Sequence, residues 1–248
     1  MGIFLNMFVI LLGWLVGCFI NYAADVLPFT RRFSPVVCQN CQAQHALIGY
    51  LLVRPCRSCG QHRTIRAWIV QFLSVAALFV ISIYPPDRLG FWLGAIILTF
   101  FGVVMVIDIE HRLILHPVSL VGAILGAGIG LWLHGWLSTL IGGLAGFGIM
   151  LGLYLFGFLF AKGLGRLRGE SIDEDALGFG DVNLSGVLGL LLGWPGITAG
   201  LIFAILLGGA GSLIVLVYML LTKRYHAFQA IPYGPFLVAA GIWALYLN

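Results

Sequence analysis

Long apolar runs separated by short polar segments constrain this chain more than any other feature. A run of about 20 apolar residues can cross the ~30 Å hydrocarbon core of a bilayer as a helix. We expect eight such helices, at residues 3–22, 67–84, 90–107, 114–133, 136–160, 177–193, 197–220 and 231–247. Breaks at His134-Gly135 and at Trp194-Pro195-Gly196 turn two longer runs into hairpins. The sequence therefore predicts an all-α polytopic membrane protein.

The composition supports the same fold class. Of the 248 residues, 61% are hydrophobic and only 9% are charged. A soluble domain carries roughly a quarter charged residues, so a soluble enzyme or a soluble binding module is excluded.

The basic residues predict the orientation. If the amino terminus lies outside, segments 23–66, 108–113, 161–180 and 221–230 face the cytoplasm. They hold all but one of the 13 Lys and Arg residues, the exception being Arg88. The formal net charge of +4 is then explained by the topology and by contact with anionic lipid, and it does not indicate a nucleic-acid partner. No basic segment precedes the first helix, so we expect that helix to be a retained anchor.

Residues 24–66 form the one extramembrane segment long enough to be a module, between a first helix at 1–23 and a membrane domain at 67–248. The segment holds two CxxC pairs, Cys38/Cys41 and Cys56/Cys59. Paired CxxC spacing is typical of a closed four-thiolate site, which favours a structural zinc, with iron second. The metal would supply the folding energy of so small a loop.

Other interpretations of these cysteines remain open. The four thiols could form two disulfides or stay inert, but a cytoplasmic loop keeps thiols reduced. His45 or His62 could replace one thiolate, although both are expected at the surface. Cys18, inside the first helix, is expected to be a small buried apolar residue.

Two of the nine carboxylates stand apart from the rest. Asp108, in "VIDIEHR", ends the third predicted helix, and Asp181, in "GFGD", starts the sixth. Both ends are predicted at the inner membrane boundary, where we expect the two carboxylates to face each other. Six other carboxylates are expected to be solvated loop charge: Asp25, Asp87, Glu170, Asp173, Glu174 and Asp175.

Paired carboxylates at a membrane boundary predict aspartic protease chemistry. Two carboxylates held close in a low dielectric share one proton, so one can activate water while the other polarises a carbonyl. The alternatives are an Asp181 that caps its helix, an Asp108 paired with Arg112, and a proton- or ion-coupled transporter. Glu110 competes with Asp108 for its role but is placed on the loop side.

The chain resembles the bacterial type IV prepilin peptidases, membrane aspartic proteases, almost from end to end. "GFGD" (Gly178, Gly180, Asp181) is similar to the GxGD motif of that family, and Asp108 stands at its first catalytic aspartate. "IPYGPFL" (Pro232, Gly234, Pro235) resembles the IPFGPFL-like stretch of the last helix, and "GCFINYAADVLP" resembles the entry to its zinc-type loop.

The resemblance implies cleavage of the short leader of a type IV prepilin or type II secretion pseudopilin after a glycine. It implies a bacterial plasma-membrane protein that acts on the cytoplasmic side. Many members also methylate the new amino terminus with S-adenosylmethionine. Here Val26 replaces a family arginine and Gln71 a family glutamate, so proteolysis is the safer inference and methyl transfer stays open.

A non-enzymatic function is the second hypothesis: a membrane carrier or an assembly scaffold with a zinc-stabilised cytoplasmic loop. One further pattern bears on a peptidase. Residues 170–175, "ESIDED", form an acidic cluster that either is a solvated loop or attracts a basic leader peptide.

Overall fold

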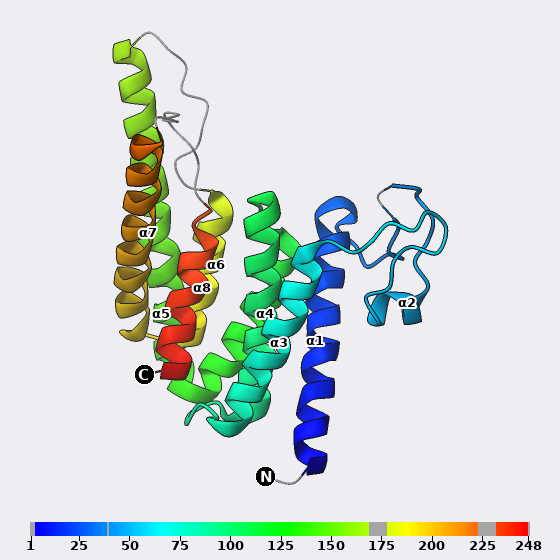
Figure 1. The fold of residues 1–248 in the computed structure, drawn as a ribbon. Helices are drawn as coiled ribbons and strands as arrows, with labels where there is room; N and C mark the ends of the chain where they lie inside the picture. Colours follow the sequence, from blue (N-terminus) through cyan, green and yellow to red (C-terminus); the bar gives the residue numbers. More distant parts are fainter. Residues whose placement is uncertain (1–2, 39, 169–177, 223–231, 248) are drawn as a thin grey trace. The chain divides into compact units, whose positions relative to one another are not determined.

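The computed structural model describes residues 3–38, 40–168, 178–222 and 232–247, and the chain divides into two compact units, Met1–Ile107 and Asp108–Asn248 (Figure 1). The acidic cluster at 170–175 lies outside the described residues. In the part of the chain that is described, every regular element is a helix, and the only β pairing is an isolated bridge between Val37 and Gln44.

The first unit is built on three long helices: α1 (Ile3–Thr30), α3 (Ile65–Ile83) and α4 (Gly90–His111), whose last turn belongs to the second unit. The short helix α2 (Leu47–Leu51) lies between α1 and α3 in sequence. Glycines let α1 approach α3 closely, because a Cβ on Gly13 would lie 2.7 Å from the Val75 backbone.

Helix α1 continues past its predicted end at residue 22. It ends at Thr30, and Arg31 follows with a positive φ of 55° while its N–H donates to the Leu27 carbonyl. The extra turns bury Val26 and Leu27 and carry Asp25, so the apolar pattern persists beyond the membrane-length run.

The second unit contains α5 (His116–Arg168), α6 (Phe179–Leu192), α7 (Gly196–Leu221), α8 (Gly234–Ile242) and a terminal π-helical turn η1 (Trp243–Leu247). Helical geometry in α5 breaks at Gly135, where φ is 76°. The predicted break at His134-Gly135 is therefore present in the structure.

The chain reverses direction at Gly135. Before the break, Gly126 lies against Val187 of α6. Gly130, further along α5, lies against Leu190, so the residue numbers rise along both helices. After the break, Gly142 meets Gly189 and Gly146 meets Ser185, in descending order. The two arms of α5 thus run antiparallel to each other, and both pack on α6.

Small residues make this packing possible. A Cβ on Gly130 would lie 2.0 Å from the Leu190 carbonyl oxygen, and one on Gly142 would lie 2.4 Å from the Gly189 carbonyl oxygen. Close contact of glycine-lined helices replaces the hydrophobic driving force that is missing between helices in lipid. These glycines thus let both arms of α5 pack closely on α6.

Five of the helices in the described residues are long and apolar enough to cross a membrane. The predicted number of eight is not confirmed by this count, for two reasons. The two arms of α5 count as one of these five although they run antiparallel on either side of Gly135, and α6, with 14 residues, and α8, with 9, are shorter than a spanning helix. Fourteen residues rise only about 21 Å.

Candidate active site and metal centre

Asp108 lies on α4, one turn before that helix ends. It is only 4% exposed, and its Oδ2 accepts the backbone N–H of Gly234 at 3.0 Å. Only glycine fits opposite this carboxylate, because a Cβ at position 234 would lie 2.5 Å from Oδ2 and 2.9 Å from the carboxylate carbon. The start of α8 therefore fixes the orientation of Asp108.

Asp181 lies in the first turn of α6 and is 7% exposed. Its Oδ2 accepts the backbone N–H of Gly178 at 3.3 Å, which is the reciprocal half of a capping box. Gly180, one residue earlier, packs against the Ile114 side chain, and a Cβ there would lie 2.7 Å from the Ile114 Cβ.

The structure brings the two buried aspartates near enough to each other for their charges to interact. The carboxylate of Asp181 interacts electrostatically with that of Asp108 and with the Tyr233 hydroxyl. Tyr233 precedes Gly234, whose N–H is bonded to Asp108. The cluster is thus assembled from the end of α4, the start of α6 and the start of α8.

The alternatives for the two aspartates fare differently. Asp181 does accept a hydrogen bond at the start of its helix, as a capping residue would. Asp108 is bonded to Arg112 only through the backbone, and no ion pair joins their side chains within the described residues, where Arg112 is exposed. Capping leaves one oxygen of Asp181 available for chemistry, so the cap and an acid–base role are compatible.

The remaining motif residues lie around this cluster. Pro232 precedes Tyr233 and is half-buried, and Pro235 occupies the first turn of α8, where its missing N–H costs no hydrogen bond. Tyr233 is not among the site residues predicted from the sequence. A single hydroxyl in the otherwise apolar "IPYGPFL" was the signal that could have drawn attention to it.

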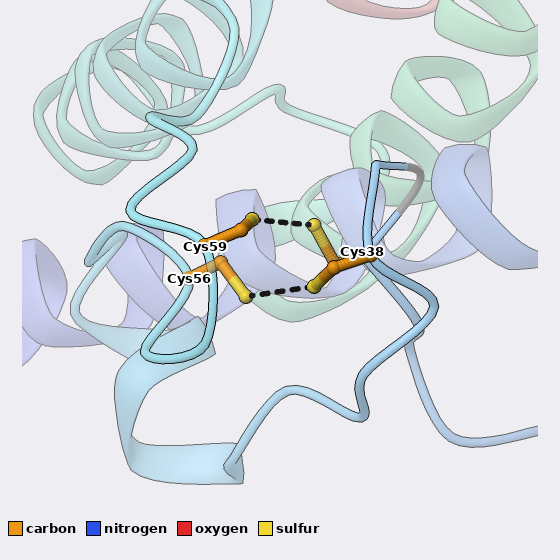
Figure 2. A group of neighbouring side chains, drawn as sticks. Cys38, Cys56 and Cys59 are labelled. Atoms are coloured by element: carbon orange, nitrogen blue, oxygen red, sulfur yellow. Dashed lines mark hydrogen bonds between the residues drawn. The ribbon is translucent and has the colours of Figure 1, made fainter.

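The four paired cysteines form a second cluster, in the first unit (Figure 2). Their sulfur atoms all lie within 4.8 Å of one another, with Cys38 Sγ 3.6 Å from Cys59 Sγ and Cys41 Sγ 3.7 Å from Cys56 Sγ. All four are free thiols, so the disulfide alternative is not realised in this structure.

The two CxxC pairs lie on two separate turns that have the same backbone hydrogen-bond pattern. The N–H of Cys38 donates to Ala43 and that of Gln42 to Cys38; the N–H of Cys56 donates to Gln61 and that of Gly60 to Cys56. The residue after each second cysteine has a positive φ, 58° at Gln42 and 71° at Gly60. The two turns are therefore equivalent knuckles that face each other.

This arrangement fits a tetrahedral metal ion. Zinc–sulfur bonds of about 2.3 Å place tetrahedral sulfur atoms about 3.8 Å apart, close to the observed separations. Backbone N–H groups of Cys41 and Asn40 lower the pKa of the Cys38 thiol to about 6, and those of Cys59 and Ser58 lower the pKa of Cys56. His62 is exposed and neither histidine belongs to the cluster.

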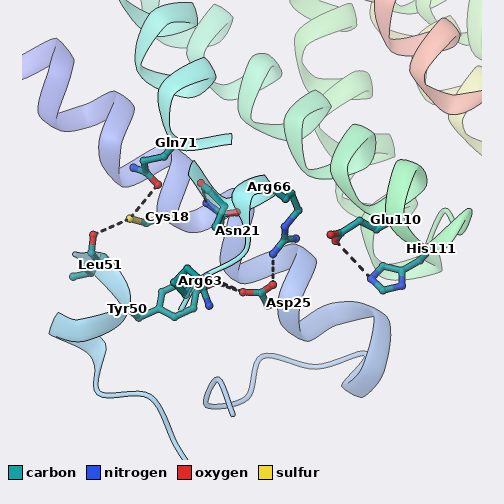
Figure 3. Close-up of polar contacts among 11 residues, drawn as sticks. Cys18, Asn21, Asp25, Tyr50, Leu51, Arg63, Arg66, Gln71, Glu110 and His111 are labelled. Carbon is teal, nitrogen blue, oxygen red and sulfur yellow. Dashed lines mark hydrogen bonds and ion pairs between the residues drawn. The ribbon is translucent and has the colours of Figure 1, made fainter. Parts of the chain in front are cut away.

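Asp25 was expected to be solvated loop charge, but it lies on α1 and is largely buried (Figure 3). Its carboxylate accepts the Tyr50 hydroxyl at 2.6 Å and an Arg63 guanidinium N–H at 2.9 Å, and it is also paired with Arg66. Burial is the largest cause that raises the pKa of Tyr50, followed by the Asp25 charge. This network joins the loop to α1 and α3.

Gln71 and Cys18 meet inside the α1–α3 interface. Gln71 is fully buried on α3; its amide nitrogen donates to the Trp14 carbonyl, and its oxygen lies 3.7 Å from the Cys18 sulfur. Cys18 is buried, as expected, but it also takes part in hydrogen bonding. Val26 is buried on α1.

Sequence comparisons add a family to this geometry. The profile of the Type IV leader peptidase family matches residues 95–213, which include both aspartates but not the cysteine cluster. The Prepilin leader peptidase/N-methyltransferase of Pectobacterium carotovorum subsp. carotovorum is 26% identical over 271 residues, 96% of this chain and 91% of that protein.

Two further relatives carry related names. The Prepilin leader peptidase/N-methyltransferase of Aeromonas hydrophila is 27% identical over 205 residues, 80% of this chain and 64% of that protein. The Type 4 prepilin-like proteins leader peptide-processing enzyme of Escherichia coli O78:H11 is 28% identical over 204 residues, 82% of this chain and 69% of that enzyme. No solved structure is significantly similar to the chain. The profile match, over nearly half of the chain, and these relatives show that the chain is similar to the type IV leader peptidases.

Proposed function

We propose that this chain is a membrane-embedded aspartic endopeptidase that removes the leader of a type IV prepilin or a type II secretion pseudopilin after a glycine. One observation carries the proposal: two buried aspartates on separate helices lie in one cluster, and each is oriented by a backbone N–H. The family match and the names of the relatives support the same activity. Nothing comparable favours a carrier or a scaffold.

The mechanism needs only one proton shared by the pair. The ionised carboxylate takes a proton from a water molecule, whose oxygen attacks the scissile carbonyl carbon. The protonated carboxyl group donates its proton to the carbonyl oxygen, which gives a tetrahedral diol. Collapse of the diol breaks the C–N bond and transfers a proton to the leaving amine, without a covalent enzyme intermediate.

Glycine has two roles in this proposal. Gly234 and Gly178 bring backbone N–H groups to the carboxylates. Gly180 lets the turn before Asp181 pack against Ile114, because a Cβ there would lie 2.7 Å from the Ile114 Cβ.

The membrane placement is part of the proposal. With the arms of α5 counted separately and with α6 and α8 included, eight apolar segments cross or enter a bacterial plasma membrane. The amino terminus lies outside, and the aspartates and the cysteine cluster lie at the cytoplasmic side. The distribution of basic residues supports this orientation.

Cys38, Cys41, Cys56 and Cys59 would hold one structural zinc ion in this account. Four thiolates close the coordination sphere, so the metal would stabilise the loop and leave no open position for catalysis.

Methyl transfer is the less supported activity. The names of two relatives include an N-methyltransferase. In this chain both ends of the Gln71 side chain are engaged inside the α1–α3 interface, and Val26 offers no charge. We assign no residue to S-adenosylmethionine.

Mass spectrometry of a prepilin co-expressed with this chain tests the proposal. We expect a mature product cut after a glycine with the wild-type chain, and uncut prepilin with Asp108→Asn or Asp181→Asn at equal membrane abundance. The same spectrum reads whether the new amino terminus carries a methyl group. Mature product with both aspartate variants would refute the peptidase assignment.

A further inference from the structure

The short helix α2 lies beside α1, not beyond its end (Figures 1 and 3). The Trp14 indole N–H on α1 donates to the Leu51 carbonyl oxygen at 2.8 Å. The Cys18 thiol, one turn further along α1, donates to the same oxygen at 3.5 Å. The end of α2 is therefore fixed to α1 at the level of Trp14 and Cys18.

The length of helix α3 indicates how deep Trp14 and Cys18 lie in a membrane. Its 19 residues rise about 28 Å, close to the ~30 Å hydrocarbon core, so its first turn marks one boundary of that core. The Asn21 side-chain amide donates to the carbonyl of Ala67 in that first turn at 3.1 Å. Asn21 therefore marks the same boundary on α1.

Cys18 and Trp14 precede Asn21 by three and seven residues. At 1.5 Å per residue they lie about 5 Å and about 10 Å inside the boundary. Trp14 also packs edge-on against Trp68 of α3 at 6.5 Å, and tryptophan is enriched near membrane interfaces. The Leu51 carbonyl thus lies within the depth at which interfacial helices bind, about 5–10 Å.

The sequence and exposure of α2 suit that depth. Residues 46–53, "ALIGYLLV", carry no charge. Ile48 is 68% exposed and Leu52 47% exposed, and they lie four residues apart on one face. Tyr50 and Val53 are buried, and the Tyr50 hydroxyl reaches back to Asp25. The exposed face of α2 is therefore apolar, and its buried face is fixed to α1 through the hydrogen bond from Tyr50 to Asp25.

The charges around α2 fit an anionic lipid surface. Asp25 is the one acidic residue between positions 24 and 66, and Arg63 and Arg66 neutralise it. Arg54 and Arg57 follow α2 directly and are exposed. Basic side chains beside an interfacial helix attract anionic headgroups.

We infer that α2 enters the leaflet that faces the four-cysteine loop, with Ile48 and Leu52 among the lipid acyl chains. The occupant of this apolar face is lipid, because Leu15 and Phe19, which directly follow Trp14 and Cys18 on α1, are exposed apolar residues at the same depth. Trp14 and Cys18 satisfy the Leu51 carbonyl, as a carbonyl at membrane depth requires. The inference is independent of the peptidase activity.

Photolabelling of the unaltered protein tests the inference without any substitution. The protein is placed in nanodiscs of phosphatidylcholine and phosphatidylglycerol that contain a phospholipid with a diazirine on its acyl chain. After illumination, mass spectrometry locates the lipid adducts. We expect labelling of Ile48 and Leu52 within about threefold of that at Leu120, an exposed residue on α5, and at least about tenfold above that at Ser58, an exposed residue between two of the cysteines.

A water-soluble diazirine provides the matched control, because it should label Ser58 and spare Ile48. Water-soluble label at Ile48 together with acyl-chain label only at Leu120 would place α2 in water and overturn the inference. Protection of Ile48 from both reagents would also overturn it, because the apolar face would then be covered by protein. Zinc content and cleavage do not enter this readout.

Discussion

At the scale of single residues, the candidate site is built from two aspartates and the glycines whose backbone N–H groups they accept. Asp108 and Asp181 could be singled out from sequence because charged residues at the ends of apolar runs are rare and costly. Their partners could not be. No local pattern reveals that the N–H of Gly234, 126 residues along the chain, is bonded to Asp108. Asp25 was misjudged for the same reason, since its partners come from α2 and α3.

Gly234→Ala should lower the cleavage rate without unfolding the protein. The new Cβ would meet the Asp108 carboxylate at 2.5 Å, so the carboxylate must turn away and lose its N–H partner. We expect cleavage of a prepilin to fall at least tenfold, as is typical when a catalytic group is misplaced. Gly148→Ala is the matched control, because a Cβ there meets nothing within 4 Å, and it should cleave at the wild-type rate. Equal activity of the two variants would contradict the assigned role of Gly234.

The two glycines of the GxGD motif should differ in their tolerance of alanine. At Gly180 a Cβ would lie 2.7 Å from the Ile114 Cβ, whereas at Gly178 the nearest atom is 3.5 Å away and φ is −78°, which alanine adopts easily. Gly180→Ala should therefore lower both thermal stability, by about 1–3 kcal/mol as overpacking does, and cleavage. Gly178→Ala should stay within about 0.5 kcal/mol of the wild type. Thermal unfolding in detergent and a cleavage assay measure both, and a larger effect at Gly178 would be inconsistent with the packing.

At the scale of elements, the apolar runs predict the helices well because membrane length and composition leave few choices. The break at Gly135 was predictable from His134-Gly135, and the knuckles were predictable from their cysteine spacing. Helix α2 was not predictable, because five residues within a loop give no periodic signal. Its position comes from hydrogen bonds to Trp14 and Cys18 that have no counterpart in the local sequence.

The cysteine cluster predicts a metal-dependent loop. Purified protein should contain about one zinc ion per chain, and Cys38→Ser or Cys56→Ser should lower that content and speed proteolysis within residues 30–66, because metal binding supplies the folding energy of such a loop. Cys18→Ala removes a thiol outside the cluster and should keep its zinc. Metal analysis combined with limited trypsin digestion reads both effects. An ordered, protease-resistant loop without metal would show that the thiols are structural by themselves.

At the scale of the whole molecule, the sequence predicted a polytopic helical protein, and every regular element in the described residues is a helix, but the predicted number of eight spans is not confirmed. Five helices meet the length and composition of a span when the two antiparallel arms of α5 are counted as one, and α6 and α8 are shorter. The short α6 is informative for function. Helix α6, about 21 Å long, begins two residues before Asp181, so this carboxylate lies near one end of a short apolar helix.

The central claim is that Asp108 and Asp181 act as one catalytic unit. The most direct test measures single-turnover cleavage of a prepilin by purified protein in liposomes, for the wild type, Asp108→Asn, Asp181→Asn and the double variant. We predict that each single variant loses at least about 1,000-fold in rate and that the double variant loses no more than either single one, because groups that act as a unit are non-additive. A single variant that keeps more than about a tenth of the wild-type rate, or losses that multiply in the double variant, would contradict the claim.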